Sequence, residues 1–133
     1  MKYILSFLLL ISLTACNQLT LDEVDEGYSV DISKAVFDSK KSTGGQRVYY
    51  VTVNVKPTPP NDDVKEIGVY IGSSIPDKDN YKKCTHQHLS HSGSAVFEIT
   101  VDNSAKYHVR GYALINKCRY WSNSSRPVGK GIK

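Results

Sequence analysis

The stretch Tyr49-Tyr50-Val51-Thr52-Val53-Asn54-Val55-Lys56 indicates the fold class most clearly. Positions 49, 51, 53 and 55 are apolar, whereas most of the residues between them are polar. A β-strand places successive side chains on opposite faces of its sheet, so this alternation gives one apolar face and one polar face. Such a strand is typical of an antiparallel sheet that covers a core with one face. We therefore predict a strand over residues 49–56.

The same two-residue period recurs from residue 28 onward, and no convincing helical period appears there. The further predicted strands are 28–37, 66–72, 97–102, 107–116 and a last one that begins near residue 119. Clusters of Gly, Pro, Ser, Asn and Asp, typical of turns, separate them. This spacing predicts one all-β domain over residues 28–133, an antiparallel β-sandwich of about seven strands.

Length and composition agree with a single folded domain. The chain has 133 residues, and 40% of them are hydrophobic. These values exclude a wholly disordered chain, a collagen-like protein and a membrane protein with several spans.

The N-terminus predicts export. Met1-Lys2 gives a positive start, and residues 3–13 are almost wholly apolar. This run is too short to cross a bilayer, which takes about 20 apolar residues. It has the proportions of a signal-peptide core. We predict a signal peptide over residues 1–15.

The signal peptide ends in Leu13-Thr14-Ala15-Cys16, which resembles the lipobox of bacterial lipoproteins. The resemblance implies a diacylglyceryl group on the Cys16 thiol and an acyl chain on its new amine. Several acyl chains anchor a protein firmly, because each buried CH₂ contributes roughly 0.8 kcal/mol. An ordinary cleaved signal followed by a free cysteine is the alternative.

The first part of the mature chain is acidic. Residues 16–38 contain six Asp and Glu residues and one Lys. We interpret residues 16–27 as a solvated acidic tether. The tether loosely resembles the surface-export signal of lipoproteins from the Bacteroides group. Asn17 is not the Asp that retains enterobacterial lipoproteins in the inner membrane. These features favour the outer membrane and leave open whether the domain faces the periplasm or the cell exterior.

Residues 66–122 resemble a fibronectin type III-like domain of Bacteroides-group surface lipoproteins. The resemblance rests on Ile67-Gly68-Val69-Tyr70 and on Tyr107-His108-Val109-Arg110-Gly111-Tyr112-Ala113, which are similar to the third and sixth strands of that fold. It implies that these two strands pair antiparallel. It also implies a tyrosine corner, in which the Tyr107 hydroxyl bonds to the backbone between residues 101 and 104. The sequence departs from the family at Asn103, where a Pro is usual, and it lacks the early-strand Trp.

Cys84 and Cys118 remain once Cys16 is lipidated. The exported compartment permits disulfides, and an even pair favours a bridge. The strand order implied by the resemblance places both residues at the same end of one sheet. We therefore predict a disulfide between them, worth about 3–4 kcal/mol for a loop of roughly 35 residues. Two separate thiols, or Cys84 as a metal ligand, are the alternatives.

The segment Cys84-Thr85-His86-Gln87-His88-Leu89-Ser90-His91 is rich in imidazole. His86 and His88 share one face of an extended segment, and His91 could fold over from the next turn. Imidazole suits zinc, copper or nickel, so these three histidines are a candidate metal site. A polar loop without a metal is the alternative. No catalytic motif is present, so we predict a protein that is not an enzyme and has no cofactor.

A binding surface is the stronger hypothesis. The outward positions of the predicted third and sixth strands, and the sheet edge that follows, bring together aromatic and arginine side chains that suit sugar rings or a protein partner. These residues are Tyr70, Arg110, Tyr112, Arg119, Tyr120 and Trp121. Aromatic residues are also common in strands simply because they form strands well.

The net charge of the predicted domain indicates which kinds of partner suit it. Residues 39–133 contain 15 Lys and Arg residues and seven Asp and Glu residues, a net charge of +8. No nucleic-acid-binding motif accompanies this charge. The basic body therefore suits anionic surface polymers or simply favours solubility. We predict a lipid-anchored, non-catalytic binding or adhesion module at the cell envelope, whose partner is a glycan or an envelope protein. A metal-binding envelope protein and a structural subunit of a surface complex are the alternatives.

Overall fold

The computed structural model describes residues 27–90 and 92–133. The predicted signal peptide, Cys16, most of the predicted tether and His91 lie outside the described residues. Within the described residues, no helix is long and apolar enough to span a membrane.

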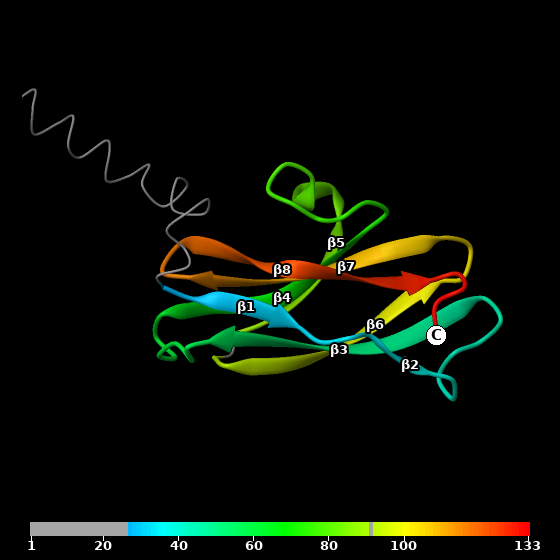
Figure 1. Cartoon of the computed structure of the whole chain (residues 1–133), viewed down its shortest axis with the longest axis horizontal. Helices are drawn as coiled ribbons and strands as arrows, with labels where there is room; N and C mark the ends of the chain where they lie inside the picture. Colours follow the sequence, from blue (N-terminus) through cyan, green and yellow to red (C-terminus); the bar gives the residue numbers. More distant parts are fainter. Residues whose placement is uncertain (1–26, 91) are drawn as a thin grey trace, which may run out of the picture.

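The described residues form eight strands and one short 3₁₀ turn (Figure 1). The strands are β1 (Ser29–Ile32), β2 (Val36–Asp38), β3 (Gln46–Lys56), β4 (Val64–Gly72), β5 (Thr85–Leu89), β6 (Ser94–Asp102), β7 (Lys106–Ile115) and β8 (Cys118–Gly129), and the turn is Tyr81–Lys83. The prediction of an all-β fold is confirmed, and no α-helix occurs in residues 27–90 or 92–133.

The strands form one curled sheet that resembles half of a barrel. One part has β3 at its centre, with β6 on one edge and β1 and β2 along the other. The second part has the order β5-β4-β7-β8. A single parallel pair between Val30 and Ser122 joins β1 to β8. The predicted antiparallel pairing of β4 with β7 is confirmed, and it places Gly72 opposite His108.

The core lies inside the curl and follows the predicted alternation. In β3 the side chains at 49, 51, 53 and 55 are buried, and in β6 every second residue is buried. The two parts of the sheet approach closely at Gly111 of β7. A Cβ atom at that position would lie 3.2 Å from the Val53 side chain of β3, so glycine permits this close packing.

The predicted tyrosine corner at Tyr107 is wrong. The Tyr107 hydroxyl donates to the Asp102 carboxylate at 2.6 Å rather than to the backbone. The turn between β6 and β7 is short, so this carboxylate lies within reach of the ring, and a charged acceptor makes the stronger hydrogen bond. The tyrosine whose hydroxyl forms hydrogen bonds with the backbone is instead Tyr49, which is completely buried. Its hydroxyl donates to the Ile132 carbonyl and accepts from the Gly129 N–H at 3.1 Å.

The predicted bridge between Cys84 and Cys118 is also wrong, because Cys84 is a free thiol. β5 runs antiparallel to β4 from the pair Thr85–Ile71, so Cys84 lies beside Gly72. Cys118 pairs with Ile115, which lies opposite Val64 at the other end of β4. Eight residues of strand separate these two ends, about 26 Å, whereas a disulfide joins Cα atoms about 4.4–6.8 Å apart.

Candidate functional site

Five of the six predicted binding residues meet on the outer face of the sheet β5-β4-β7-β8. Because alternate residues of a strand share a face, this face carries Tyr70 of β4, Arg110 and Tyr112 of β7, and Arg119 and Trp121 of β8. Cross-strand pairing places Tyr112 directly opposite Trp121. The outward positions predicted for Tyr70, Arg110 and Tyr112 agree with this face, whereas Arg119 and Trp121 were expected only at the sheet edge that follows.

Tyr120 does not belong to this face. It lies between Arg119 and Trp121 in β8, so its side chain points to the opposite side of the sheet. There it makes an edge-to-face contact with Tyr28, with ring centroids 5.8 Å apart, and packs against the core. Tyr120 therefore contributes to packing, and its predicted place in the binding face is wrong.

A third tyrosine, Tyr81, completes the group. We call Tyr70, Tyr81, Tyr112, Trp121 and Arg119 the Arg119 cluster. The ring centroid of Tyr70 lies 4.7 Å from that of Tyr112, 5.4 Å from that of Tyr81 and 5.5 Å from that of Trp121. These separations are typical of favourable aromatic pairs.

Arg119 lies among the four rings. Its guanidinium carbon is 4.2 Å from the ring centroid of Tyr81 and 5.7–6.0 Å from those of the other three rings. Cations within about 6 Å of a ring face are attracted by the ring quadrupole, and the attraction strengthens when water is excluded. The cluster is therefore held by cation–π contacts as well as by burial.

Residues 73–84 form a roof over this cluster. Figure 1 shows this segment above the sheet, on the side away from β3 and β6. The Arg110 side chain fastens the roof, because its Nη1 donates to the Pro76 carbonyl at 3.0 Å while its Nε donates to the Ser122 carbonyl at 2.8 Å. Within the roof, the Asp77 carboxylate accepts from the Asn80 N–H at 2.9 Å. Such local bonds are typical of tight turns that begin with Asp.

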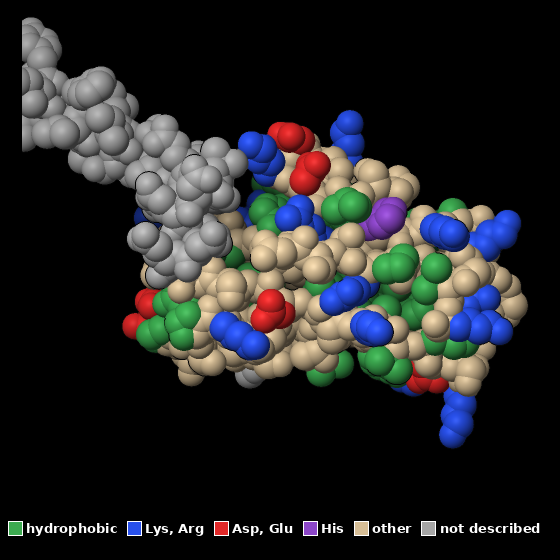
Figure 2. Space-filling view, in the orientation of Figure 1, with side chains coloured by type: hydrophobic (Ala, Val, Ile, Leu, Met, Phe, Trp, Pro, Cys, Tyr) green, Lys and Arg blue, Asp and Glu red, His purple; other side chains and the backbone are tan. Residues whose placement is uncertain are grey.

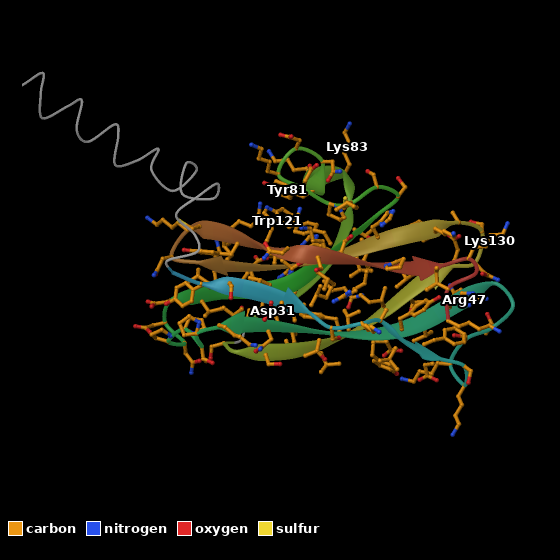
Figure 3. All side chains as sticks on the ribbon, in the orientation of Figure 1. Asp31, Arg47, Tyr81, Lys83, Trp121 and Lys130 are labelled. Atoms are coloured by element: carbon orange, nitrogen blue, oxygen red, sulfur yellow. The ribbon has the colours of Figure 1, made fainter. Side chains whose placement is uncertain are left out.

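The roof covers part of the predicted binding surface. Tyr112 is completely buried and Tyr70 is 5% exposed, so neither ring offers an open face to a ligand. Tyr81, Arg119 and Trp121 are only partly buried. Figure 3 shows Tyr81 and Trp121 close together on the roof side of the molecule. We refer to these three residues as the rim of the Arg119 cluster.

Arg119 is electrostatically unusual. Its Nε is the only buried side-chain nitrogen or oxygen in residues 27–90 and 92–133 that lacks a hydrogen-bond partner. No carboxylate in the described chain lies within 4.0 Å of its guanidinium. The nearby Glu66 carboxylate instead accepts a hydrogen bond from the Tyr112 hydroxyl at 2.5 Å. Arg119 is therefore a partly desolvated cation with no paired anion in the described chain.

The pKa values of the Tyr81 and Tyr112 hydroxyls are shifted by their surroundings. A hydrogen bond from the Arg119 guanidinium lowers the pKa of Tyr81, because the cation favours the phenolate. Burial raises the pKa of Tyr112, and its bond to Glu66 raises it further. The pKa values of these two hydroxyls therefore shift in opposite directions.

The histidine site stays a prediction. His86 stacks on Tyr70 with ring centroids 5.2 Å apart, and His88 stacks on His86 at 5.3 Å. Both are on β5 and share a face as predicted, whereas His91 lies outside the described residues. No group of three metal-type ligands occurs in the part of the chain that the structure describes.

A separate cleft opens at the seam of the half-barrel, between the start of β5 and the end of β6. Its volume is about 370 Å³. Its lining combines hydroxyl groups, one carboxylate, one ammonium and aliphatic side chains: Ile71, Gly72, Ser73, Lys83, Thr85, Thr100, Val101, Asp102 and Tyr107. This cleft is not predictable from the sequence, because its shape depends on how far the sheet curls.

The sequence pattern also gave no indication that Tyr81 and Glu66 belong to this site. Tyr81 lies in a turn, where no strand period exists to indicate which way a side chain points. The turn-forming run at residues 77–80 was the one sequence signal nearby, and it indicates a tight turn without showing what the turn covers.

Comparisons with known proteins leave the family open. No protein-family model matches the chain, and no curated protein matches it. Among solved structures, a crystal structure of a β-glucosidase from Kluyveromyces marxianus in complex with glucose is 12% identical over 77% of this chain, with a TM-score of 0.29. The match spans 14% of that enzyme. A similarity this low carries no argument about fold or activity.

The reactivity of the Cys84 thiol, at the end of the roof, tests whether Arg110 holds the roof in place. Burial raises the pKa of this thiol, and the nearby Asp77 raises it further, so we expect slow alkylation at neutral pH. Arg110→Gln removes the cation that holds Pro76 and should speed alkylation of Cys84 several-fold. Mass spectrometry of the peptide that contains Cys84 measures the rate. Lys130→Gln, which removes a charge at the far end of the molecule, should leave the rate unchanged (Figure 3).

Proposed function

We propose that this chain is a lipid-anchored, non-catalytic binding module of the outer membrane that holds an anionic ligand at the rim of the Arg119 cluster. Cys16 carries the anchor, and residues 16–27 connect it to the folded body. The ligand is an anionic glycan or other surface polymer of the cell envelope.

The observation that carries this proposal is the state of Arg119. A desolvated cation normally has a carboxylate partner, because its lost hydration must be replaced. Arg119 has four aromatic rings around it and no carboxylate within 4.0 Å in the described chain. Its Nε is enclosed, so a ligand would reach the terminal nitrogens beside Tyr81. An anionic group bound there would supply the missing partner.

The surroundings of Arg119 support an anionic ligand. The rim combines a guanidinium with the Trp121 and Tyr81 rings, and these three residue types are the ones most enriched in binding hot spots. Lys82 and Lys83 of the roof are exposed nearby. Figure 2 shows Lys and Arg side chains spread over the visible face, with apolar side chains between them. The positive charge favours the approach of a polyanion.

We further propose that the domain is a fibronectin type III-like β-sandwich. The strand order supports this assignment, because β6-β3-β1 and β5-β4-β7-β8 correspond to two sheet halves that face each other across the core. The antiparallel pairing of β4 and β7 also supports it. This fold accommodates many functions, so the function rests on the Arg119 cluster.

The binding proposal is tested with the full chain in detergent micelles and with alginate, a carboxylated polymer. Arg119→Gln should weaken alginate binding by about tenfold or more, because a hydrogen bond to a charged group contributes roughly 1.5–3 kcal/mol. Lys130→Gln removes the same charge elsewhere and should change binding less than about twofold. Equal binding by Arg119→Gln and the native chain, or equal losses in both variants, would contradict the proposal.

The anchor is tested separately. Cys16→Ser removes the acceptor of the lipid, so metabolic labelling with a fatty acid should disappear and the protein should leave the membrane fraction. Fractionation of cells that express each form measures the change. A Cys16→Ser protein that stays in the membrane fraction would show that something other than this cysteine anchors the chain.

A further inference from the structure

The sheet does not close into a barrel. Among the strands of residues 27–90 and 92–133, β5 pairs with β4 alone and β6 pairs with β3 alone, so the facing edges of β5 and β6 leave a seam. The Gln87 side chain crosses it, because its Nε2 donates to the Glu98 carbonyl at 2.9 Å. Beyond this contact lies the cleft of about 370 Å³. That volume falls in the range of about 300–1,000 Å³ typical of small-molecule sites.

The Asp102 carboxylate at the cleft is held in a fixed position. It accepts hydrogen bonds from the Tyr107 hydroxyl at 2.6 Å and from the Ser104 N–H at 2.9 Å. The Ser104 and Tyr107 hydroxyls lower the pKa of Asp102, so it is ionised at neutral pH. No basic side chain of the described residues lies within 4.0 Å of it. A carboxylate has about four lone-pair sites, so acceptor capacity remains for a ligand.

The remaining lining limits the charge of the ligand. Lys83 borders the same cleft and disfavours a cation, whereas Asp102 disfavours an anion. The Ser73, Thr85 and Thr100 side chains add hydroxyl groups that both donate and accept. A neutral ligand with several hydroxyl groups therefore fits the lining best.

The inner part of the cleft is apolar. Ile71 and Val101 are core residues that keep 8% of their surface exposed, and both line the cleft. The half-buried Tyr107 ring adds a flat wall. A sugar ring presents C–H groups on its faces and hydroxyl groups at its edge. Its faces match the aliphatic floor and the Tyr107 ring, and its hydroxyl groups match Asp102 and the threonines.

We propose that the cleft between β5 and β6 binds one neutral sugar residue, whose hydroxyl groups donate to the Asp102 carboxylate. This site is distinct from the rim of the Arg119 cluster, because none of the three rim residues lines the cleft. The proposal goes beyond the binding of an anionic ligand and does not depend on it.

The experiment titrates the full chain in detergent micelles with the methyl glycosides of glucose, galactose and mannose, and follows binding by saturation-transfer NMR. At least one of the three should bind. Asp102→Asn should weaken its binding about tenfold, equivalent to about 1.4 kcal/mol. Thr100→Val, which replaces an exposed hydroxyl without changing the shape, should also weaken binding. Asp31→Asn is the matched control, because Asp31 is an exposed carboxylate on β1 that pairs with Lys56 (Figure 3).

Each outcome decides for or against the proposal. Loss of binding in Asp102→Asn and Thr100→Val, but not in Asp31→Asn, supports it. Binding of none of the three glycosides overturns it, and so does an equal effect of Asp102→Asn and Asp31→Asn. Tighter binding of methyl glucuronide or of methylammonium overturns the assignment to a neutral ligand. Arg119→Gln should leave glycoside binding unchanged, so failure of the Arg119 proposal and failure of this one are separable.

Discussion

Replacing Tyr49 with alanine is expected to lower the free energy of unfolding by about 3–5 kcal/mol, the range for truncating a buried aromatic side chain. Tyr49 is completely buried in β3, and its ring lies 5.4 Å from that of Phe37. Its hydroxyl also holds the end of β8 and the residues after it through Gly129 and Ile132. Chemical denaturation of the full chain in micelles, followed by tryptophan fluorescence, measures the change.

Tyr49→Phe separates the contribution of the buried ring from that of the hydroxyl. This variant keeps the ring and removes the hydroxyl, so the Gly129 N–H loses its partner in a buried place. We expect a loss of about 1–3 kcal/mol. An unfolding free energy equal to that of the native chain would show that this hydroxyl does not hold the end of β8.

The second large effect is expected at Gly68. Gly68 pairs with Tyr112 across β4 and β7, and the Tyr112 ring extends over it. A Cβ atom at Gly68 would lie 2.3 Å from the Gln87 carbonyl oxygen and 2.8 Å from the Tyr112 ring. Backbone cannot yield as a flexible side chain does, so β5 must shift. We expect Gly68→Ala to lower the unfolding free energy by about 1–3 kcal/mol, as overpacking does.

Gly45→Ala is the matched control, because a Cβ atom there meets nothing within 4 Å. Its effect on stability should be within about 0.5 kcal/mol, as for most surface changes. Hydrogen exchange should also become faster in β5 of Gly68→Ala and stay unchanged in Gly45→Ala. Equal stability of the two variants would mean that Tyr112 does not pack over Gly68 as described.

The strands were predictable because their periodicity is strong and local. The alternation at residues 49–56 specifies which side chains face the core, and β3 buries those side chains. The same alternation placed Tyr70 and Tyr112 on one face. The pairing of their two strands was implied by the family resemblance, and Trp121 was expected only at the sheet edge that follows. Tyr120 was assigned to that face because it stands beside Trp121 in the sequence, although the strand period excludes it.

Features that depend on loop paths were not predictable. The alternation in β4 and β7 says nothing about residues 73–84, which return to the Gly72 end before β5 begins. That return places Cys84 far from Cys118 and puts Tyr81 over Tyr70. A short polar segment of this kind has many accessible paths, and the bond from Arg110 that holds this one joins residues far apart in the sequence. The volume of the seam cleft likewise depends on sheet curvature, which no single residue encodes.

The most direct test of the Arg119 site is an NMR titration of the ¹⁵N-labelled full chain in micelles with a short oligomer of galacturonic acid. The Arg119 Nε–H lies among four aromatic rings, whose ring currents should separate its signal from those of the other arginines. We predict that the largest shifts occur at the Arg119 Nε–H and at the Trp121 indole N–H. Shifts that spread over the lysine-rich surface and leave both signals unchanged would contradict the account.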